Sequence, residues 1–219
     1  MKFLNTAAAL AALTIGMAAA GASQATVYTL TLDGCSSSCG AGPFGTVTVT
    51  DNPTDVGSLD VVVQLAAGIQ FNGAGASKTH TALAFDLVGN PAVTIQNISD
   101  TANFAGAGAI ANASPFGAFG YTLDWKGPNG NPTGVTSLSF EIKTSGAPLT
   151  LGSTDYNGTP LFFTADVLGN GNTGNVAATG VPTTGGGVPE PATWAMMLMG
   201  FGGLGAMLRS RRRQALVTA

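Results

Sequence analysis

The sequence predicts an all-β fold for the central part of the chain, an antiparallel β-sandwich with one apolar helix at each end. Short runs of β-forming residues recur between turn signals, and several of them alternate apolar and polar residues. The run TVTVT at 46–50 places its valines on one face and its threonines on the other. Glycine accounts for 32 of the 219 residues, which favours turns over long helices. Because this region lacks sustained helical periodicity, its pattern favours a β-sandwich.

Eight strands are expected within this outer domain. They cover residues 26–33, 45–51, 59–65, 82–88, 92–98, 119–125, 135–143 and 160–168. Turns rich in Gly, Asn and Pro join them, as at 127–130. The outer domain is therefore expected to span residues 26–175. A flexible linker rich in Gly and Thr is expected to follow it over residues 176–188.

The N-terminus predicts a secretory signal peptide over residues 1–25, whose apolar stretch forms the signal helix. Lys2 precedes a long apolar run, and small residues follow that run. Ser23 and Ala25 fit positions −3 and −1 of a signal peptidase site, so cleavage is expected after Ala25. Cleavage after Ala22 is the alternative.

The C-terminus predicts a single transmembrane helix over residues 192–208. This run is apolar and close to the shortest length that spans a bilayer. A basic cluster follows it, made of Arg209, Arg211, Arg212 and Arg213. Because positive charge marks the cytoplasmic side, the outer domain is expected to face away from the cytoplasm. Residues 214–219 would then form a short cytoplasmic tail.

A short motif directly precedes this helix. Its members are Pro189, Glu190, Pro191, Trp194 and Ala195. Together with the Gly-rich apolar run and the basic cluster, the motif resembles the PEPxxWA variety of the PEP-CTERM sorting signal over residues 189–213. The same tail is also labelled the ice-binding protein C-terminal domain, a label that assigns no ice binding to the outer domain.

The resemblance implies processing by an exosortase, a membrane-embedded cysteine protease or transpeptidase that acts near Pro189 to Pro191 and removes the helix. It also implies a Gram-negative bacterium that makes exopolysaccharide. The outer domain would first stand on the periplasmic side of the inner membrane, and the mature protein would reach the cell surface, matrix or biofilm. A permanent single-pass anchor is the alternative, and the Pro-Glu-Pro motif argues against it.

The two cysteines, Cys35 and Cys39, are expected to form a disulfide. An even cysteine count in an exported chain favours this pairing. Two free thiols are the alternative. Two thiolates and one distant histidine do not complete a tetrahedral metal site, so no metal and no cofactor are expected.

The titratable and nucleophilic residues of the outer domain show no catalytic pattern, so no enzyme activity is expected. His80 is the only histidine and is interpreted as a solvated side chain. A glycosidase would need two carboxylates across a cleft, but dispersed acids are the preferred interpretation of the candidates, which are Asp60, Asp86, Asp124, Glu141 and Asp166. Two loops rich in Asp and Asn could bind calcium but are better explained as turns; they contain Asp51, Asn52 and Asp55, and Asp166, Asn170, Asn172 and Asn175.

The sequence favours no particular binding surface. Ten acidic residues and three lysines lie between Thr26 and Val188, and this acidity argues against a nucleic-acid partner. Aromatic residues suited to sugars are equally suited to a core, and core is the preferred interpretation of Phe116, Tyr121, Trp125 and Tyr156. Thr46, Thr48 and Thr50 form one row, with no repeat that would favour ice binding.

The leading hypothesis is a structural or adhesive component associated with exopolysaccharide. A carbohydrate- or calcium-binding module is the alternative, and a polysaccharide hydrolase is the least favoured.

Overall fold

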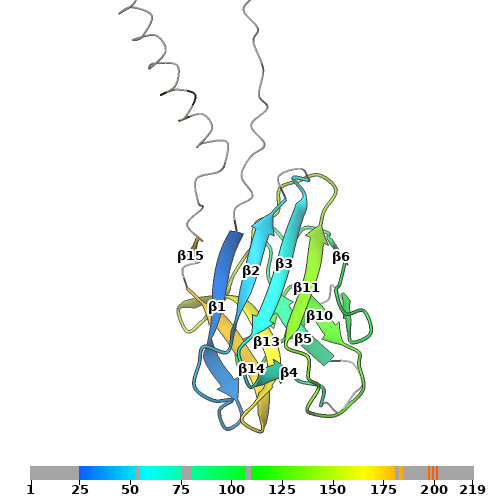
Figure 1. The fold of residues 1–219 in the computed structure, drawn as a ribbon, viewed down its shortest axis with the longest axis vertical. Helices are drawn as coiled ribbons and strands as arrows, with labels where there is room; N and C mark the ends of the chain where they lie inside the picture. The colour runs from blue at the N-terminus through cyan, green and yellow to red at the C-terminus, as the bar shows by residue number, and fades with distance from the viewer. Residues whose placement is uncertain are drawn as a thin grey trace, which may run out of the picture. The chain divides into compact units, whose positions relative to one another are not determined.

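The computed structural model describes residues 25–52, 55–74, 80–106, 110–180 and 183–184, together with Met197, Met199 and Phe201. The part from 25 to 184 confirms the predicted all-β class, and its strands pair in antiparallel fashion (Figure 1). The signal helix lies outside the described residues. So does the predicted transmembrane helix, apart from the three residues just named, which are helical. Among the described residues, no helix combines the length and the apolar character needed to cross a membrane.

One path of hydrogen-bonded strands organises the outer domain, in the order β6-β11-β3-β2-β1-β14-β13-β5-β10-β7. The strands are β1 (Ala25–Cys35), β2 (Gly45–Asp51), β3 (Ser58–Leu65), β4 (Ile69–Phe71), β5 (His80–Phe85), β6 (Thr94–Gln96), β7 (Phe104–Gly106), β8 (Ala111–Asn112), β9 (Ala118–Phe119), β10 (Tyr121–Trp125), β11 (Ser137–Lys143), β12 (Thr154–Tyr156), β13 (Thr159–Gly169), β14 (Asn172–Thr179) and β15 (Thr183–Thr184). Strands β4 and β12 pair with β13, β15 pairs with β1, and β8 and β9 form a separate hairpin.

The long strand β1 belongs to both halves of this path. Its N-terminal half pairs with β2, and its C-terminal half pairs with β14. The register shifts between Leu30 and Leu32, the kind of irregularity that bends and twists a strand. Figure 1 shows β2, β3 and β11 in front of β5, β13 and β14, with β1 at the side where the two groups meet.

The two ends of the path also lie side by side. A Cβ atom added to Gly106 in β7 would stand 2.8 Å from the Cβ of Ile95 in β6. Only a glycine permits this close approach of the two strands. The path of strands therefore returns on itself around its apolar interior.

Alternation along the strands builds the main core. In β2, Val47 and Val49 are buried, while Thr46, Thr48 and Thr50, which alternate with them, are half-buried. Phe85 lies among three other aromatic rings, stacked on Tyr121 at 5.5 Å and tilted against Phe163 and Phe140 at 6.0 and 6.1 Å. Such ring pairs add to the stabilisation that comes from burying the apolar area itself.

A second, smaller core covers the opposite face of β5, β13 and β14. Ala84 and Ala177 on this face are fully buried. Phe116 and Phe119, from the segment that contains the β8–β9 hairpin, pack against them. Small side chains on the strands thus give room for the aromatic rings of the covering segment.

The end of the outer domain lies later in the chain than predicted. Strand β14 continues to Thr179, and Val176, Ala177 and Ala178 within it are fully buried. The linker predicted over 176–188 therefore begins inside a strand. The sequence GNTGN before Val176 has the composition of a loop, and the alanines give little hydrophobic alternation, so the pattern hides this strand.

Replacing Phe85 with alanine is expected to lower the free energy of unfolding by about 3–5 kcal/mol, because the cavity would lie between three rings. Val62, whose side chain is 46% exposed, offers the matched control: Val62→Ala should cost about 1 kcal/mol or less. Chemical denaturation of both variants measures the difference. Equal losses would show that Phe85 is not a central packing residue.

Candidate functional site

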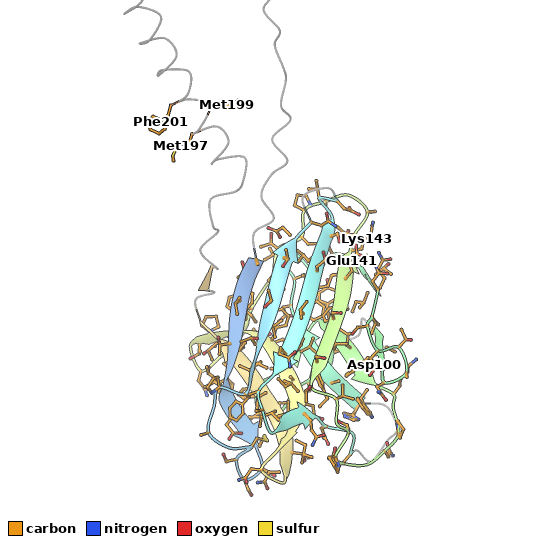
Figure 2. The ribbon with its side chains drawn as sticks, in the orientation of Figure 1. Asp100, Glu141, Lys143, Met197, Met199 and Phe201 are labelled. Atoms are coloured by element: carbon orange, nitrogen blue, oxygen red, sulfur yellow. A yellow bond between two sulfur atoms is a disulfide. The ribbon has the colours of Figure 1, made fainter. Side chains whose placement is uncertain are left out.

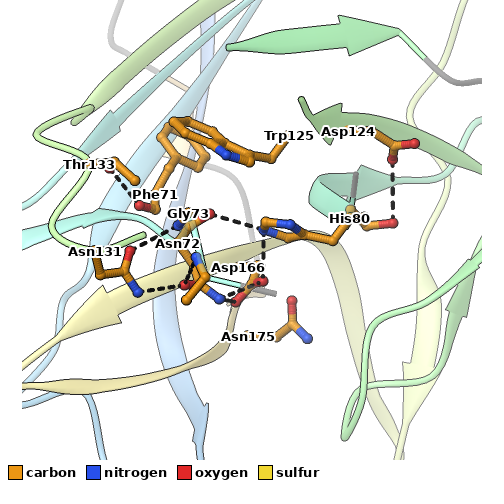
Figure 3. Close-up of polar contacts among 12 residues, drawn as sticks. Phe71, Asn72, Gly73, His80, Asp124, Trp125, Asn131, Thr133, Asp166 and Asn175 are labelled. Atoms are coloured by element: carbon orange, nitrogen blue, oxygen red, sulfur yellow. Dashed lines mark hydrogen bonds and ion pairs between the residues drawn. The ribbon is translucent and has the colours of Figure 1, made fainter. Parts of the chain in front are cut away.

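A partly buried group of polar side chains, which we call the Asp166 cluster, lies where β13 passes β4 and the start of β5. It consists of Asn72, His80, Asn131 and Asp166 (Figure 3). Along β13, Ala165 and Val167 point into the main core, and Asp166 points to the other side. The carboxylate of Asp166 accepts hydrogen bonds from Asn72 Nδ2 at 3.1 and 3.3 Å. His80 Nε2 stands 3.5 Å from Asp166 Oδ2, and both side chains are 17% exposed.

Asn72 is the centre of the Asp166 cluster. Its backbone N–H donates to the carbonyl of Asp166 at 3.0 Å. Its Oδ1 accepts from Asn131 Nδ2 at 2.8 Å and from the backbone N–H of Ala74 at 2.9 Å. Asn131 Oδ1 in turn accepts from the backbone N–H of Gly73 at 2.9 Å. These bonds connect the segment after β4 to β13 and to the loop around residue 131.

The electrostatics of the Asp166 cluster follow from its burial. Burial raises the pKa of Asp166, while the Asn72 hydrogen bonds and the nearby His80 act in the opposite direction. His80 Nε2 lies 2.9 Å from the carbonyl oxygen of Asn72 and must donate to it, because a carbonyl only accepts. His80 Nδ1 is buried without a hydrogen-bond partner among the described residues. The interpretation of His80 as a solvated side chain was therefore wrong.

Glu141 anchors a second group of polar contacts, at the outer face of β11 (Figure 2). Its carboxylate accepts hydrogen bonds from Ser58 Oγ, from Gln96 Nε2 at 2.9 Å and from Asn97 Nδ2 at 2.6 Å. These bonds, with that from Ser58 the largest cause, hold the pKa of Glu141 below its usual range. Nearby, the ammonium group of Lys143 contacts the carboxylate of Asp55. Glu141 thus ties β3 and the β6 segment to β11.

Cys35 and Cys39 form the predicted disulfide, which is confirmed. The short loop between them is held by Asp33, whose carboxylate accepts from Ser38 Oγ at 2.6 Å and from the backbone N–H groups of Cys35 and Cys39 at 3.0 and 3.1 Å. Burial acts to raise the pKa of Asp33, but these three hydrogen bonds outweigh it and the pKa is lowered. Ser36 also donates its backbone N–H to Thr173, which attaches the loop to β14.

The two loops considered for calcium use their side chains in local hydrogen bonds. Asp55 contacts Lys143, and its backbone closes a turn with Asn52 and Ser58. Asn172 donates its side-chain amide to the carbonyls of Ser38 and Asn170. In the described residues these contacts are those of turns and loop attachments.

Asn175 likewise donates, to the carbonyl of Ser114, so the second loop does not gather its four side chains around one point. Asp166 faces the cluster around Asn72 instead.

The carboxylates considered for hydrolysis also have structural partners. Asp86 accepts from the backbone N–H of Gly120 at 2.6 Å and from the Thr154 hydroxyl. Asp124 accepts from the Thr81 hydroxyl at 3.5 Å. Asp60 and Glu141 stand opposite each other on β3 and β11. A general acid requires a raised pKa, whereas that of Glu141 is lowered.

The core interpretation of the aromatic residues is confirmed for three of them. Tyr121, Trp125 and Phe116 are buried, so none of them offers a ring face to a sugar. Tyr156 is half-buried and packs edge-on against Phe116.

Several predicted sites fall outside the described residues. They are the sorting motif (Pro189, Glu190, Pro191, Trp194 and Ala195) and the basic cluster (Arg209, Arg211, Arg212 and Arg213). Ala25, the predicted signal cleavage residue, is the first residue of β1.

No sequence pattern predicted a role for Asn72 and Asn131, which build the Asp166 cluster, or for Gln96 and Asn97, which bind Glu141. Asn72 follows the apolar residue Phe71 and precedes a glycine, which is the composition of an ordinary turn. Their partners lie far away in the chain, so no local signal distinguishes them.

Comparison with known proteins identifies the tail. A family model described as the PEP-CTERM protein-sorting motif matches residues 187–213, which confirms the resemblance. The chain matches no curated protein and no solved structure. The motif indicates an exported protein that is targeted to an exosortase and processed at the membrane.

Two isosteric substitutions are expected to change the pH dependence of stability in opposite directions. The folded-state pKa of Asp166 is raised, so its contribution to stability is present at low pH and is lost as pH rises through that pKa. Asp166→Asn should therefore gain stability relative to the parent protein as pH rises from the acidic range to neutrality.

The folded-state pKa of Glu141 is lowered, so its contribution to stability is lost as pH falls through that pKa. Glu141→Gln lacks this contribution and should therefore lose stability relative to the parent protein as pH rises.

Urea unfolding at a series of pH values between about 3 and 7 measures both differences, a range that brackets the ordinary carboxyl pKa values. Each variant serves as the control for the other, because both remove one carboxyl proton site. Slopes of the same sign would contradict the assigned environments.

Proposed function

We propose that the mature protein is a non-enzymatic structural or adhesive component of the extracellular matrix, associated with exopolysaccharide and released from the inner membrane by an exosortase. The observation that carries this proposal is the sorting motif at residues 187–213, at the end of an exported chain. The motif supports a path from the periplasmic side of the membrane to the cell surface or biofilm.

The outer domain supports a passive role for two reasons. Its strands form one continuous hydrogen-bonded path, in which β1 pairs with β2 on one side and with β14 on the other. Its carboxylates are used to fasten loops: Asp33 holds the disulfide loop, Asp86 holds the loop at Gly120, and Glu141 holds the β6 segment. Such roles suit a domain whose task is to keep its shape outside the cell.

A carbohydrate-binding module is the second candidate, supported by a shallow hollow beside β10. The hollow has a volume of about 390 Å³ and is lined by Asn90, Pro91, Val93 and Ile110, among others. Ile110 is 80% exposed at this hollow. An amide beside apolar groups is a lining that can hold a sugar ring, whose faces are apolar and whose edges bear hydroxyls.

Removal of the exosortase from the producing bacterium tests the proposal. With the exosortase present, we expect a mature protein whose C-terminus lies near Pro189 to Pro191 and which fractionates with the matrix. Without the enzyme, the protein should keep residues 192–213 and fractionate with the membrane. Intact-mass spectrometry of both fractions measures the difference.

Two variants of the chain sharpen this experiment. Replacing Pro189, Glu190 and Pro191 together with alanine should reproduce the loss of processing in a host that has the enzyme. Gly186→Ala, in the linker just before the motif, should leave processing unchanged. A protein that keeps residues 192–213 in every host would be a permanent membrane protein, and the proposed matrix role would be wrong.

A further inference from the structure

The hairpin that joins β12 to β13 ends in a two-residue turn at the surface. Tyr156 pairs with Thr159, so Asn157 and Gly158 form the turn between the two strands. Both turn residues are exposed, and both have positive φ angles, 53° and 79°, as a type I′ turn requires. The carboxylate of Asp155 accepts a hydrogen bond from the backbone N–H of Gly158 at 3.2 Å, which closes the turn.

The base of this hairpin is fastened to the rest of the domain. The hydroxyl of Thr154 donates to the carboxylate of Asp86. The ring of Tyr156 packs edge-on against that of Phe116, with 5.2 Å between the ring centroids. The turn therefore stands at the exposed tip of a hairpin whose base is held by the fold.

The tip carries the acceptor triplet of N-linked glycosylation, which is Asn-X-Ser/Thr with any residue but proline at X. The triplet is Asn157-Gly158-Thr159. The type I′ turn explains the asparagine and the glycine, but it does not require a hydroxyl at position 159. In the part of the chain that the structure describes, neither the side-chain amide of Asn157 nor the hydroxyl of Thr159 makes a hydrogen bond. The fold thus leaves both recognition groups of the triplet without a structural task.

Two other triplets of this kind occur in the sequence, and the fold uses both. In the triplet 97–99, the amide of Asn97 donates to Glu141 at 2.6 Å, and the hydroxyl of Ser99 accepts from a backbone N–H at 3.0 Å. In the triplet 112–114, the middle residue, Ala113, is buried in the second core. An enzyme could bind either triplet only by opening these contacts.

We propose that Asn157 is the acceptor of an N-linked oligosaccharide, added on the periplasmic side of the inner membrane. Its amide is exposed in the folded domain and in the unfolded chain alike, so the assignment is the same whether the transfer precedes or follows folding. A bulky hydrophilic group fits at a surface turn. The proposal goes beyond the matrix role, and it needs only the export that the sorting motif indicates.

The transfer requires an oligosaccharide donor in the membrane, a sugar chain linked to a polyprenyl diphosphate. The amide nitrogen of Asn157 attacks the anomeric carbon of this donor and forms a C–N bond. The bond from the anomeric carbon to the diphosphate oxygen breaks, and the polyprenyl diphosphate leaves with the bonding electrons. The amide nitrogen gives up one proton to a base of the transferase.

Mass spectrometry of the exported protein, purified from its native host, tests the proposal. We expect an intact mass above that of the processed chain, with the added mass on the peptide that contains Asn157. A protein without added mass, or one with the sugar on Asn97 or Asn112, would overturn the proposal. The C-terminal peptide is identified in the same sample, so a failure of exosortase processing is distinguished from a failure of glycosylation.

Four variants separate the acceptor triplet from the shape of the turn. Asn157→Gln should remove all of the added mass, whereas Asn112→Gln, which changes another exposed asparagine, should keep it. Thr159→Val retains the size of the side chain and loses only the hydroxyl, so occupancy should fall at least tenfold. Thr159→Ser restores the hydroxyl and should restore occupancy. A sugar that persists in Thr159→Val, or one that is missing from Thr159→Ser as well, would contradict the proposal.

Discussion

The bend within β1 is the constraint on which the rest of the outer domain depends. The strand pairs with β2 up to Leu30 and with β14 from Leu30 onward, and its register with β14 shifts between Leu30 and Leu32. One continuous strand therefore fixes the relative position of both groups of strands. Tyr28 and Leu30, which are buried at the bend, contribute to the core between them. Because backbone bonds and core packing coincide there, neither group can shift without breaking both.

Several loops are attached to this frame by carboxylates that accept hydrogen bonds from neutral donors. Asp33, Asp86 and Glu141 bind backbone N–H groups, hydroxyls and side-chain amides, and only the Lys143–Asp55 contact pairs an acid with a lysine in the described residues. Such hydrogen bonds are directional, and they give a carboxylate a partner without needing a basic side chain, of which this domain has few. The consequence is an acidic domain whose charges hold its shape, which agrees with the proposed role of a passive component outside the cell.

Features that depend on a local sequence pattern could be predicted, whereas features that depend on contacts between distant residues could not. Alternation placed β2 and β11 close to their observed positions, because a half-buried strand has a period of two. Strand β14 was not predicted, because its buried alanines follow a stretch that has the composition of a loop. The sorting tail was recognised since its motif, apolar run and arginines are contiguous. The Asp166 cluster was not, because Asn72, Asn131 and Asp166 meet only in the folded chain.

Native-state hydrogen exchange on the backbone amides of β1 tests most directly whether this strand holds the domain together. If both groups of strands depend on β1, its hydrogen-bonded amides on either side of the Leu30–Leu32 bend should exchange only through global unfolding. Their opening free energy would then equal the unfolding free energy from denaturant. Exchange of the β1 amides through a lower-energy local opening, with β13 and β14 still protected, would contradict the account.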